Sequence, residues 1–231
     1  KAFNAGQTCV APDYVLCPAD RVQSFVDEFR ARFSEMYPSL RDNDDFTAII
    51  NERQYDRLQG YLEDAREKGA ELVEINPARE NLKDGTRKLP LTLVLNTTPD
   101  MKVMQDEIFG PILPIVSYGS LDEAIHYIND RPRPLALYFF GYDKTQQQHV
   151  VDNTHSGGMC INDSLMHVAQ DDLPFGGIGD SGMGHYHGRE GFLTFSHHRA
   201  IFTKQKFNSG KFVYAPHGTA AHKMVYKFFI R

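Results

Sequence analysis

An alternation of short apolar runs and helix-forming segments between residues 112 and 161 constrains the fold most. Three of these runs have the length and composition of strands: Ile112–Val116, Leu135–Gly141 and Gly158–Ile161. Between them, Ser120 and Glu123 form a capping box that predicts a helix, and Asp143 is suited to cap another helix that ends near Asn153. This β-α-β-α-β order predicts an α/β fold with a doubly wound, mostly parallel sheet and right-handed crossovers.

The preceding part of the chain continues the same pattern. Apolar residues at spacings of three and four predict a helix over Pro18–Met36, with Pro18 in its first turn. A second helix is expected over Asn51–Lys68, where Gly69 ends it. Two further runs read as strands: Glu71–Ile75 and Lys88–Leu95.

Composition excludes several classes of protein. Hydrophobic residues make up 41% of the 231 residues, which is enough for a packed core. A net charge of −5 argues against a nucleic-acid partner. The sequence has neither a signal peptide nor an apolar run long enough to span a membrane. The chain has three cysteines, a low and odd number that argues against a disulfide framework. It favours a reducing, cytoplasmic compartment.

Cys9 is the candidate for a reactive group. It ends the segment F-N-A-G-Q-T-C, in which Gly6 permits a tight backbone approach beside the thiol. A turn leading into a helix would aim backbone N–H groups at the sulfur, which would favour the thiolate and could hold an oxyanion. A suggestive cysteine only nine residues into the chain indicates that the sequence begins inside a longer protein.

Four motifs in this order resemble the aldehyde dehydrogenase superfamily. The F-N-x-G-Q-x-C pattern surrounds that family's nucleophilic cysteine, and E-I-F-G-P recurs at residues 107–111. P-F-G-G follows at residues 174–177, and Y-H-G-R-E-G-F at residues 186–192 is similar to the class 3 branch. The resemblance covers residues 1 to about 206 and implies that residues 1–195 form the cysteine-bearing catalytic domain.

The resemblance implies a covalent oxidation of an aldehyde with NAD or NADP as the cofactor. Cys9 would form a thiohemiacetal and then a thioester, which water hydrolyses to the carboxylic acid. Glu107 would bind the nicotinamide ribose and Phe109 would pack near the nicotinamide. Asn162 would prop the active-site loop. The residues expected to form that loop at the substrate are Pro174, Phe175 and Gly176.

The resemblance also shows what the chain lacks. The family's general base lies in an E-L-G-G-like segment before the cysteine, and its adenosine-binding Rossmann-type domain also comes earlier. Neither is present, so the isolated chain is expected to be inactive. The class 3-like motif favours aromatic or medium- to long-chain aliphatic aldehydes and does not separate NAD from NADP.

Residues 196–231 are expected to form an oligomerisation strand and a basic tail. Ser196–Lys204 reads as a late strand, and the family's subunits pair through such a strand, which implies a homodimer. No acidic residue follows Glu190, whereas the tail carries cations and aromatic residues. They are Arg199, Lys204, Lys206, Lys211, Lys223, Lys227 and Arg231, with Phe212, Tyr214, Tyr226, Phe228 and Phe229. The tail is either a solvated segment packed on the protein or a contact with a membrane surface or substrate entrance.

The remaining cysteines and the clustered histidines are not expected to form a reactive or metal-binding site. Cys17 and Cys160 are expected to be structural, and C-x7-C matches no usual zinc spacing. No metal site is expected from the histidines, which are His185, His187, His197 and His198. A Cys–His hydrolase and a non-catalytic module that keeps the fold are the alternatives to a dehydrogenase.

Overall fold

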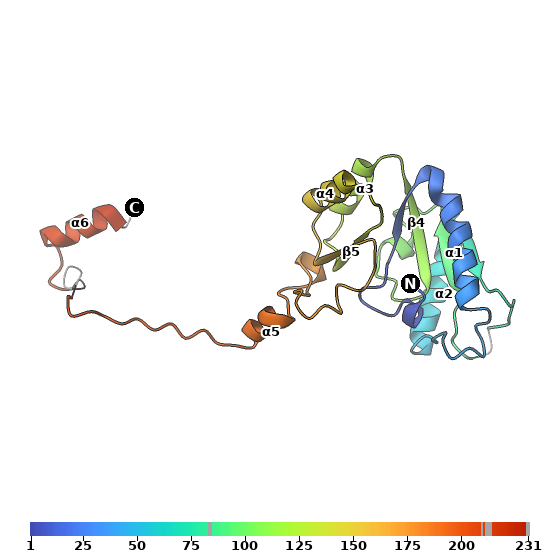
Figure 1. Ribbon diagram of the computed structural model, residues 1–231, viewed down its shortest axis with the longest axis horizontal. Coiled ribbons are helices and arrows are strands. Elements are labelled where there is room, and N and C mark those ends of the chain that lie inside the picture. Colours follow the sequence, from blue (N-terminus) through green and yellow to red (C-terminus); the bar gives the residue numbers. More distant parts are fainter. Residues whose placement is uncertain (83–84, 209, 211–213, 230–231) are drawn as a thin grey trace. The chain divides into compact units, whose positions relative to one another are not determined.

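The computed structural model describes residues 1–82, 85–208, 210 and 214–229. The chain divides into two compact units, Lys1–Thr194 and Phe195–Arg231 (Figure 1). Three residues of the basic, aromatic pattern in the tail, Lys211, Phe212 and Arg231, lie outside the described residues.

The main sheet of the first unit has four strands in the order β1-β4-β3-β2. Their bounds are β1 Val15–Pro18, β2 Glu71–Ile75, β3 Leu91–Leu95 and β4 Ile112–Tyr118. β4 pairs in parallel with both β1 and β3, whereas β2 joins β3 as an antiparallel edge strand. The prediction of an α/β fold with a mostly parallel sheet is therefore confirmed.

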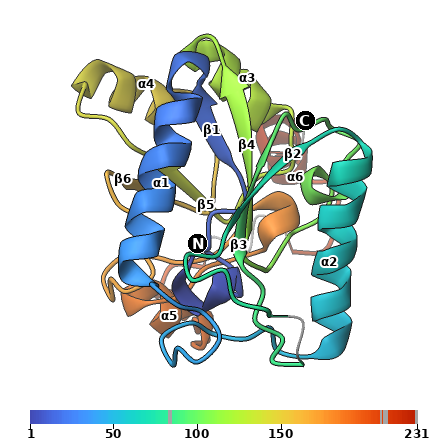
Figure 2. The ribbon, with the colours of Figure 1, turned by 90° about the vertical axis from the view of Figure 1, so that its right-hand side faces the viewer.

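Helices cover both faces of this sheet, with α1 (Val22–Met36) on one side and α2 (Glu52–Glu67) on the other (Figure 2). Side chains alternate between the faces of a strand, so β3 contributes to two cores. Leu91, Leu93 and Leu95 pack in the cluster that contains α1, whereas Val94 packs in the cluster that contains α2. All five residues of β3 are buried, as expected for a central strand covered on both faces.

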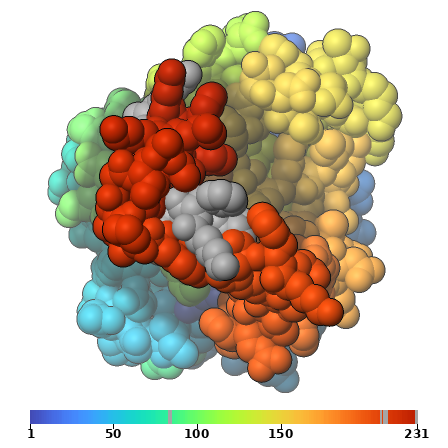
Figure 3. All heavy atoms as spheres, turned by 90° about the vertical axis from the view of Figure 1, so that its left-hand side faces the viewer, coloured from blue at the N-terminus to red at the C-terminus, as the bar shows by residue number. Residues whose placement is uncertain are grey.

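The second half of the β-α-β-α-β pattern forms its own layer. β5 (Ala136–Phe139) and β6 (Gly158–Ile161) pair in parallel as a separate two-stranded sheet rather than extending the main one. α3 (Leu121–Asn129) and α4 (Lys144–Asn153) lie next to each other at the surface (Figures 1 and 3). Their apolar sides pack with these strands in one small core of Ile125, Leu137 and Val150.

Both predicted helix caps are present. The Ser120 hydroxyl accepts the Glu123 N–H at 3.2 Å, and the Glu123 carboxylate accepts the Gly119 N–H rather than that of Ser120. The Asp143 carboxylate accepts two N–H groups at the start of α4, at 2.8 and 3.1 Å. These side chains satisfy donors that a helix start leaves without partners.

Two predicted boundaries are wrong. Pro18 ends β1, paired with Tyr118, and a 3-10 turn at Ala19–Arg21 precedes α1. β3 begins at Leu91 rather than at residue 88, directly after Pro90, which has no N–H for a ladder. Residues 196–204 form no strand within the described residues of one chain, and their predicted pairing with another subunit stays a prediction.

The remaining helices are short. Three single-turn 3-10 segments lie in loops, and two α-helices follow the second sheet. They are η1 Phe3–Gly6, η3 Lys102–Met104, η4 Gly179–Ser181, α5 Gly188–Thr194 and α6 Ala220–Phe229. Within the described residues, no helix has the length and apolar character needed to cross a membrane. α6 leaves Met224, Tyr226 and Phe228 exposed beside the exposed Lys223 and Lys227.

Candidate active site

The loop that carries Cys9 has an unusual backbone. Asn4 and Ala5 both have φ of 50° and Gly6 has φ of 72°, so three successive residues are left-handed. Such a conformation costs free energy for residues other than glycine and persists only when the surroundings hold it. Cys9 then lies exposed in a turn closed by the hydrogen bond from Ala11 N to Thr8 O, 2.9 Å long. The predicted helix after this turn is wrong, because the chain runs into β1 instead.

Gln7 is the main anchor of this loop. Its amide oxygen accepts the Ile50 N–H at 2.9 Å, and its amide nitrogen donates to the carbonyls of Ala48 and Asn4 at 3.1 Å each. The Asn4 side chain in turn donates to the Gln7 carbonyl at 3.0 Å. The asparagine and glutamine of the F-N-x-G-Q-x-C motif therefore hold the left-handed backbone and tie it to the segment before α2.

The loop of Cys9 packs directly on the loop of Glu107 and Phe109. A Cβ atom added to Gly6 would lie 2.7 Å from the carbonyl carbon of Gly110, far inside normal contact. Ala5 and Ile108, one from each loop, are fully buried and share one core with Leu58 of α2. The two sequence motifs, about 100 residues apart, thus meet in space.

The loop of Glu107 is held at its middle residue. Ile108 is fully buried, its N–H donates to the Asp13 carboxylate at 3.1 Å, and its carbonyl accepts from the Arg57 guanidinium at 2.5 Å. Arg57 also donates to the Glu107 carbonyl at 3.3 Å. With Ile108 pointing inward, the flanking Glu107 and Phe109 side chains face outward, and Phe109 is 41% exposed in a left-handed conformation with φ of 47°.

This pair of side chains fits the expected part of a nicotinamide cofactor. An ionised carboxylate accepts hydrogen bonds from ribose hydroxyls, and an exposed aromatic ring offers a flat apolar contact. The backbone between them is fixed by Asp13 and Arg57, so both groups are presented in a set arrangement.

A buried cation lies beneath this loop. The Lys1 side chain is 2% exposed, and its Nζ has no hydrogen-bond partner among the residues that the structure describes. This nitrogen lies 3.9 Å from the Asp13 carboxylate. Burial lowers the pKa of Lys1 to about 8, an effect that Asp13 and Glu107 oppose. Burial likewise raises the pKa of Asp13, although Lys1, the Ile108 N–H and Arg57 act in the opposite direction. Each group of the pair therefore offsets part of the other's desolvation.

The P-F-G-G turn reaches the Cys9 loop through a chain of side chains. Phe175 is buried, and its backbone exchanges two 2.9 Å hydrogen bonds with Tyr186. Its ring lies 5.7 Å from the ring of His167, which lies 5.9 Å from the ring of Tyr138. The Tyr138 hydroxyl donates to the Val10 carbonyl at 2.7 Å, one residue after Cys9.

The neighbours of Phe175 differ in exposure. Pro174 is exposed, and Gly176 is half-buried against the backbone of Gly184 and His185. No hydrogen bond of the described residues joins either of them to the Cys9 loop, so their expected place at the substrate stays a prediction.

Asn162 lies at the end of β6, in a left-handed conformation with φ of 59°. Its side-chain oxygen accepts the Gly141 N–H at 2.8 Å, and its own N–H donates to the Phe139 carbonyl at 2.7 Å. It therefore joins the ends of β5 and β6. Whether it also props the active-site loop stays a prediction.

Sequence reasoning missed four residues that hold the site: Asp13, Arg57, Tyr138 and His167. Only Tyr138 had a visible signal, since it places a hydroxyl in an otherwise apolar strand, and a buried tyrosine hydroxyl needs a partner. Cys17 and Cys160 are buried. The described residues contain no group of three or more metal-ligating side chains.

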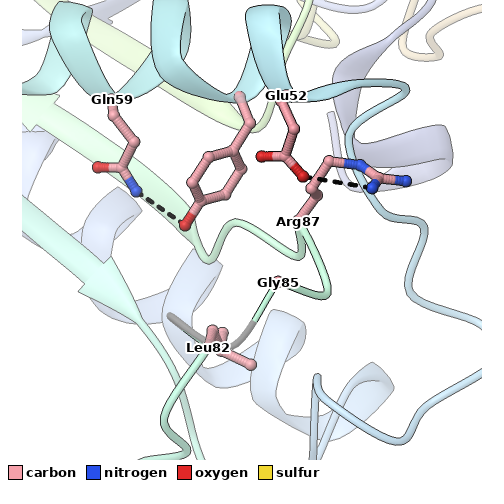
Figure 4. A pocket seen from close by; sticks show the side chains of 6 residues that line it. Glu52, Gln59, Leu82, Gly85 and Arg87 are labelled. Carbon is pink, nitrogen blue, oxygen red and sulfur yellow. Dashed lines mark hydrogen bonds and ion pairs between the residues drawn. The ribbon is translucent and has the colours of Figure 1, made fainter.

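Two hollows lie outside this arrangement. One of about 350 Å³ opens between α2 and the residues Leu82, Gly85 and Arg87, where Arg87 and Glu52 pair at 3.4 Å and Gln59 donates to the Tyr55 hydroxyl at 3.1 Å (Figure 4). The other, about 480 Å³, is an apolar groove between Phe3 and the aromatic residues of α1. Neither is lined by Cys9, Glu107 or Phe109.

Comparisons with known proteins agree with the motifs. The model of the aldehyde dehydrogenase family matches residues 1–201. A protein of Pseudomonas aeruginosa named "Probable coniferyl aldehyde dehydrogenase" is 59% identical over 231 residues, which are 100% of this chain and 48% of that protein. Mouse "Aldehyde dehydrogenase family 3 member A2" is 44% identical over 205 residues, 88% of this chain and 40% of that protein.

Solved structures give the same picture. Staphylococcus aureus AldH in a substrate-bound state is 40% identical with a TM-score of 0.79, covering 97% of this chain and 48% of that one. Staphylococcus aureus betaine aldehyde dehydrogenase in complex with NAD+ is 28% identical with a TM-score of 0.72, covering 84% and 39%. The chain thus spans about half the length of the proteins it matches or less.

Proposed function

Because the chain belongs to the aldehyde dehydrogenase family, we propose that it is the C-terminal, cysteine-bearing part of an NAD(P)-dependent enzyme that oxidises aldehydes to carboxylic acids. The observation that carries the proposal is the direct contact of the Cys9 loop with the Glu107 loop at Gly6 and Gly110. This contact supports the proposal, because it joins the loop of the proposed nucleophile to the loop of the proposed nicotinamide site.

Cys9 is the nucleophile of the proposed reaction. Its thiolate adds to the aldehyde carbon, and the carbonyl oxygen becomes the oxyanion of a thiohemiacetal. A bound nicotinamide cofactor supplies the hydride acceptor. Loss of hydride from the former aldehyde carbon leaves a thioester on Cys9, and water hydrolyses it to the acid and the free thiol. The exposure of Cys9 in its turn leaves the sulfur open to a substrate.

Glu107 and Phe109 are the proposed cofactor-binding residues. The Glu107 carboxylate accepts hydrogen bonds from the ribose, and the Phe109 ring packs near the nicotinamide. Their outward direction on a backbone held by Asp13 and Arg57 supports both roles. Whether NAD or NADP is preferred depends on residues that bind the adenosine end, which this chain does not supply.

An aromatic aldehyde of the coniferyl type is the proposed substrate. The support is the name of a relative 59% identical to this chain. A medium- or long-chain aliphatic aldehyde is the competing choice, favoured by the class 3-like motif at residues 186–192. The proposed substrate loop comprises Asn162, Pro174, Phe175 and Gly176.

The second unit is proposed to serve assembly. The pattern of residues 196–204 is that of a strand, and we propose that this segment pairs with another subunit of a homodimer. The exposed aromatic and basic side chains of α6 suit a peripheral membrane contact. We place the enzyme in the cytoplasm because of its low cysteine count.

A Cys–His hydrolase is the weaker candidate. Among the described residues, the hydrogen-bonded thiol–imidazole pair is Cys160 with His167, 3.2 Å apart, and both are buried. Cys9 has no such partner among the described hydrogen bonds, whereas a hydrolase needs a base beside its nucleophile.

The test is aldehyde-dependent NAD(P)H formation by the longer protein that contains this chain. Cys9→Ala should abolish turnover, and Cys17→Ala, which removes a buried thiol elsewhere, should retain it. The 231-residue chain alone should be silent, because it lacks the family's general base. A full-length wild type that is silent with aliphatic and aromatic aldehydes and both cofactors would leave the non-catalytic module as the better reading.

A further inference from the structure

Tyr138 is a residue to which the reaction described above gives no role. It lies in β5, where Leu137 points into the small core with α3 and α4. Because neighbouring side chains of a strand point to opposite faces, Tyr138 points away from that core. There it meets the loop of Cys9, 128 residues away in the sequence.

Tyr138 contacts two loops. Its hydroxyl donates to the Val10 carbonyl at 2.7 Å, and its ring centroid lies 5.9 Å from that of His167. Val10 is buried and directly follows Cys9, while the buried His167 belongs to the loop between β6 and the P-F-G-G turn. Burial raises the pKa of Tyr138 to about 12, so the hydroxyl keeps its proton and remains a donor at neutral pH.

Both loops need such a support. The Cys9 loop is left-handed at three successive residues, and Leu165 has φ of 66°, a costly conformation for a branched side chain. The Tyr138 ring also meets the edge of the His167 ring, whose Nδ1 lies 3.2 Å from the Cys160 sulfur. The ring contacts fix the direction of the hydroxyl.

We propose that Tyr138 is a positioning residue, whose hydroxyl ties the turn of Cys9 to β5 while its ring packs on His167. The inference rests on the proposed role of Cys9 as the nucleophile. Without the hydroxyl, the carbonyl of the buried Val10 loses a hydrogen-bond partner. The turn of Cys9 then moves more freely, and the thiol spends less time in the orientation that reacts.

Hydrogen exchange on the 231-residue chain tests the coupling without any activity. Tyr138→Phe removes only the hydroxyl, and Tyr142→Phe is the matched control, since Tyr142 is 88% exposed. In Tyr138→Phe, the peptide covering residues 8–14 should exchange at least about five-fold faster, the factor for one net hydrogen bond. Peptides covering residues 163–170, α1 and α2 should keep their wild-type rates, because the ring contact with His167 remains. Unchanged exchange at residues 8–14, or faster exchange throughout the first unit, would overturn the proposal.

Kinetics of the longer enzyme give the second readout. Tyr138→Phe should lower kcat on the order of ten-fold while KM for the cofactor stays near the wild-type value, because Asp13 and Arg57 hold the Glu107 loop separately. A rise in that KM with unchanged kcat would overturn the positioning role. A wild type without turnover would refute the proposed function instead, and hydrogen exchange would then decide the role of Tyr138.

Discussion

Replacing Gly6 by alanine tests whether the nucleophile loop and the cofactor loop are in direct contact. The added Cβ would lie 2.7 Å from the Gly110 carbonyl carbon, whereas carbon atoms normally approach to about 3.5 Å or more. The obstacle is backbone held from the other side by Leu58, so it cannot move aside as a flexible side chain would. The two loops would have to separate.

Gly69→Ala is the matched control. Gly69 follows α2 with φ of 90°, and a Cβ there meets nothing within 4 Å. Both variants place alanine in a left-handed conformation, which costs about 1 kcal/mol. Only Gly6→Ala adds an overlap in a packed region, which costs about 1–3 kcal/mol more.

Thermal unfolding measures the difference. At about 2–4 °C per kcal/mol for a chain of this size, Gly69→Ala should lower Tm by roughly 2–4 °C and Gly6→Ala by roughly 4–16 °C, about two to four times as much. Hydrogen exchange at residues 105–111 should rise only in Gly6→Ala. If Gly6→Ala lowers Tm no more than Gly69→Ala does, the loops are not in contact, and the observation that carries the proposed function is lost.

Three further substitutions follow from the same contacts. Asp13→Ala leaves the buried Ile108 N–H without an acceptor and should destabilise the chain by about 1–3 kcal/mol in thermal melts, whereas Asp13→Asn keeps an oxygen acceptor and should cost less. Asp143→Ala removes the cap of α4 and should cost about 1 kcal/mol, measured in the same way; no loss would refute the cap. Burial lowers the pKa of His167 below 6.5, so the unfolded chain binds this proton first, and the free energy of unfolding should fall as the pH drops through and below 6.5. His167→Gln should flatten that slope between pH 7 and pH 5, and an unchanged slope would show that His167 does not cause it.

Features that depend on residues close together in the chain could be predicted from the sequence. Ser120 and Asp143 cap helices because a short polar side chain can reach the N–H groups that follow it, whatever the rest of the fold does. Gly6 was expected to allow a tight backbone approach, and the structure shows which backbone approaches. The alternation of apolar runs was enough to predict an α/β fold with a mostly parallel sheet, because strand and helix periods differ.

The pairing partners of the strands could not be predicted from the sequence. A strand is stabilised by hydrogen bonds to a neighbour, and a pattern of side chains does not name that neighbour. The sequence therefore did not predict that β5 and β6 form a separate sheet. It also did not predict that residues 196–204, which read as a strand, form none within the described chain. The helix expected after Cys9 failed similarly, because the following residues pair with β4.

The sequence by itself therefore determined the class of fold and the candidate groups, Cys9, Glu107 and Phe109. Tertiary structure alone decided what holds them, because Asp13, Arg57 and Tyr138 act across 50 to 128 residues of chain. The sequence around a charged or hydroxyl side chain does not show which distant carbonyl or N–H group it will contact. That contact depends on which loops the packed sheets and helices bring together.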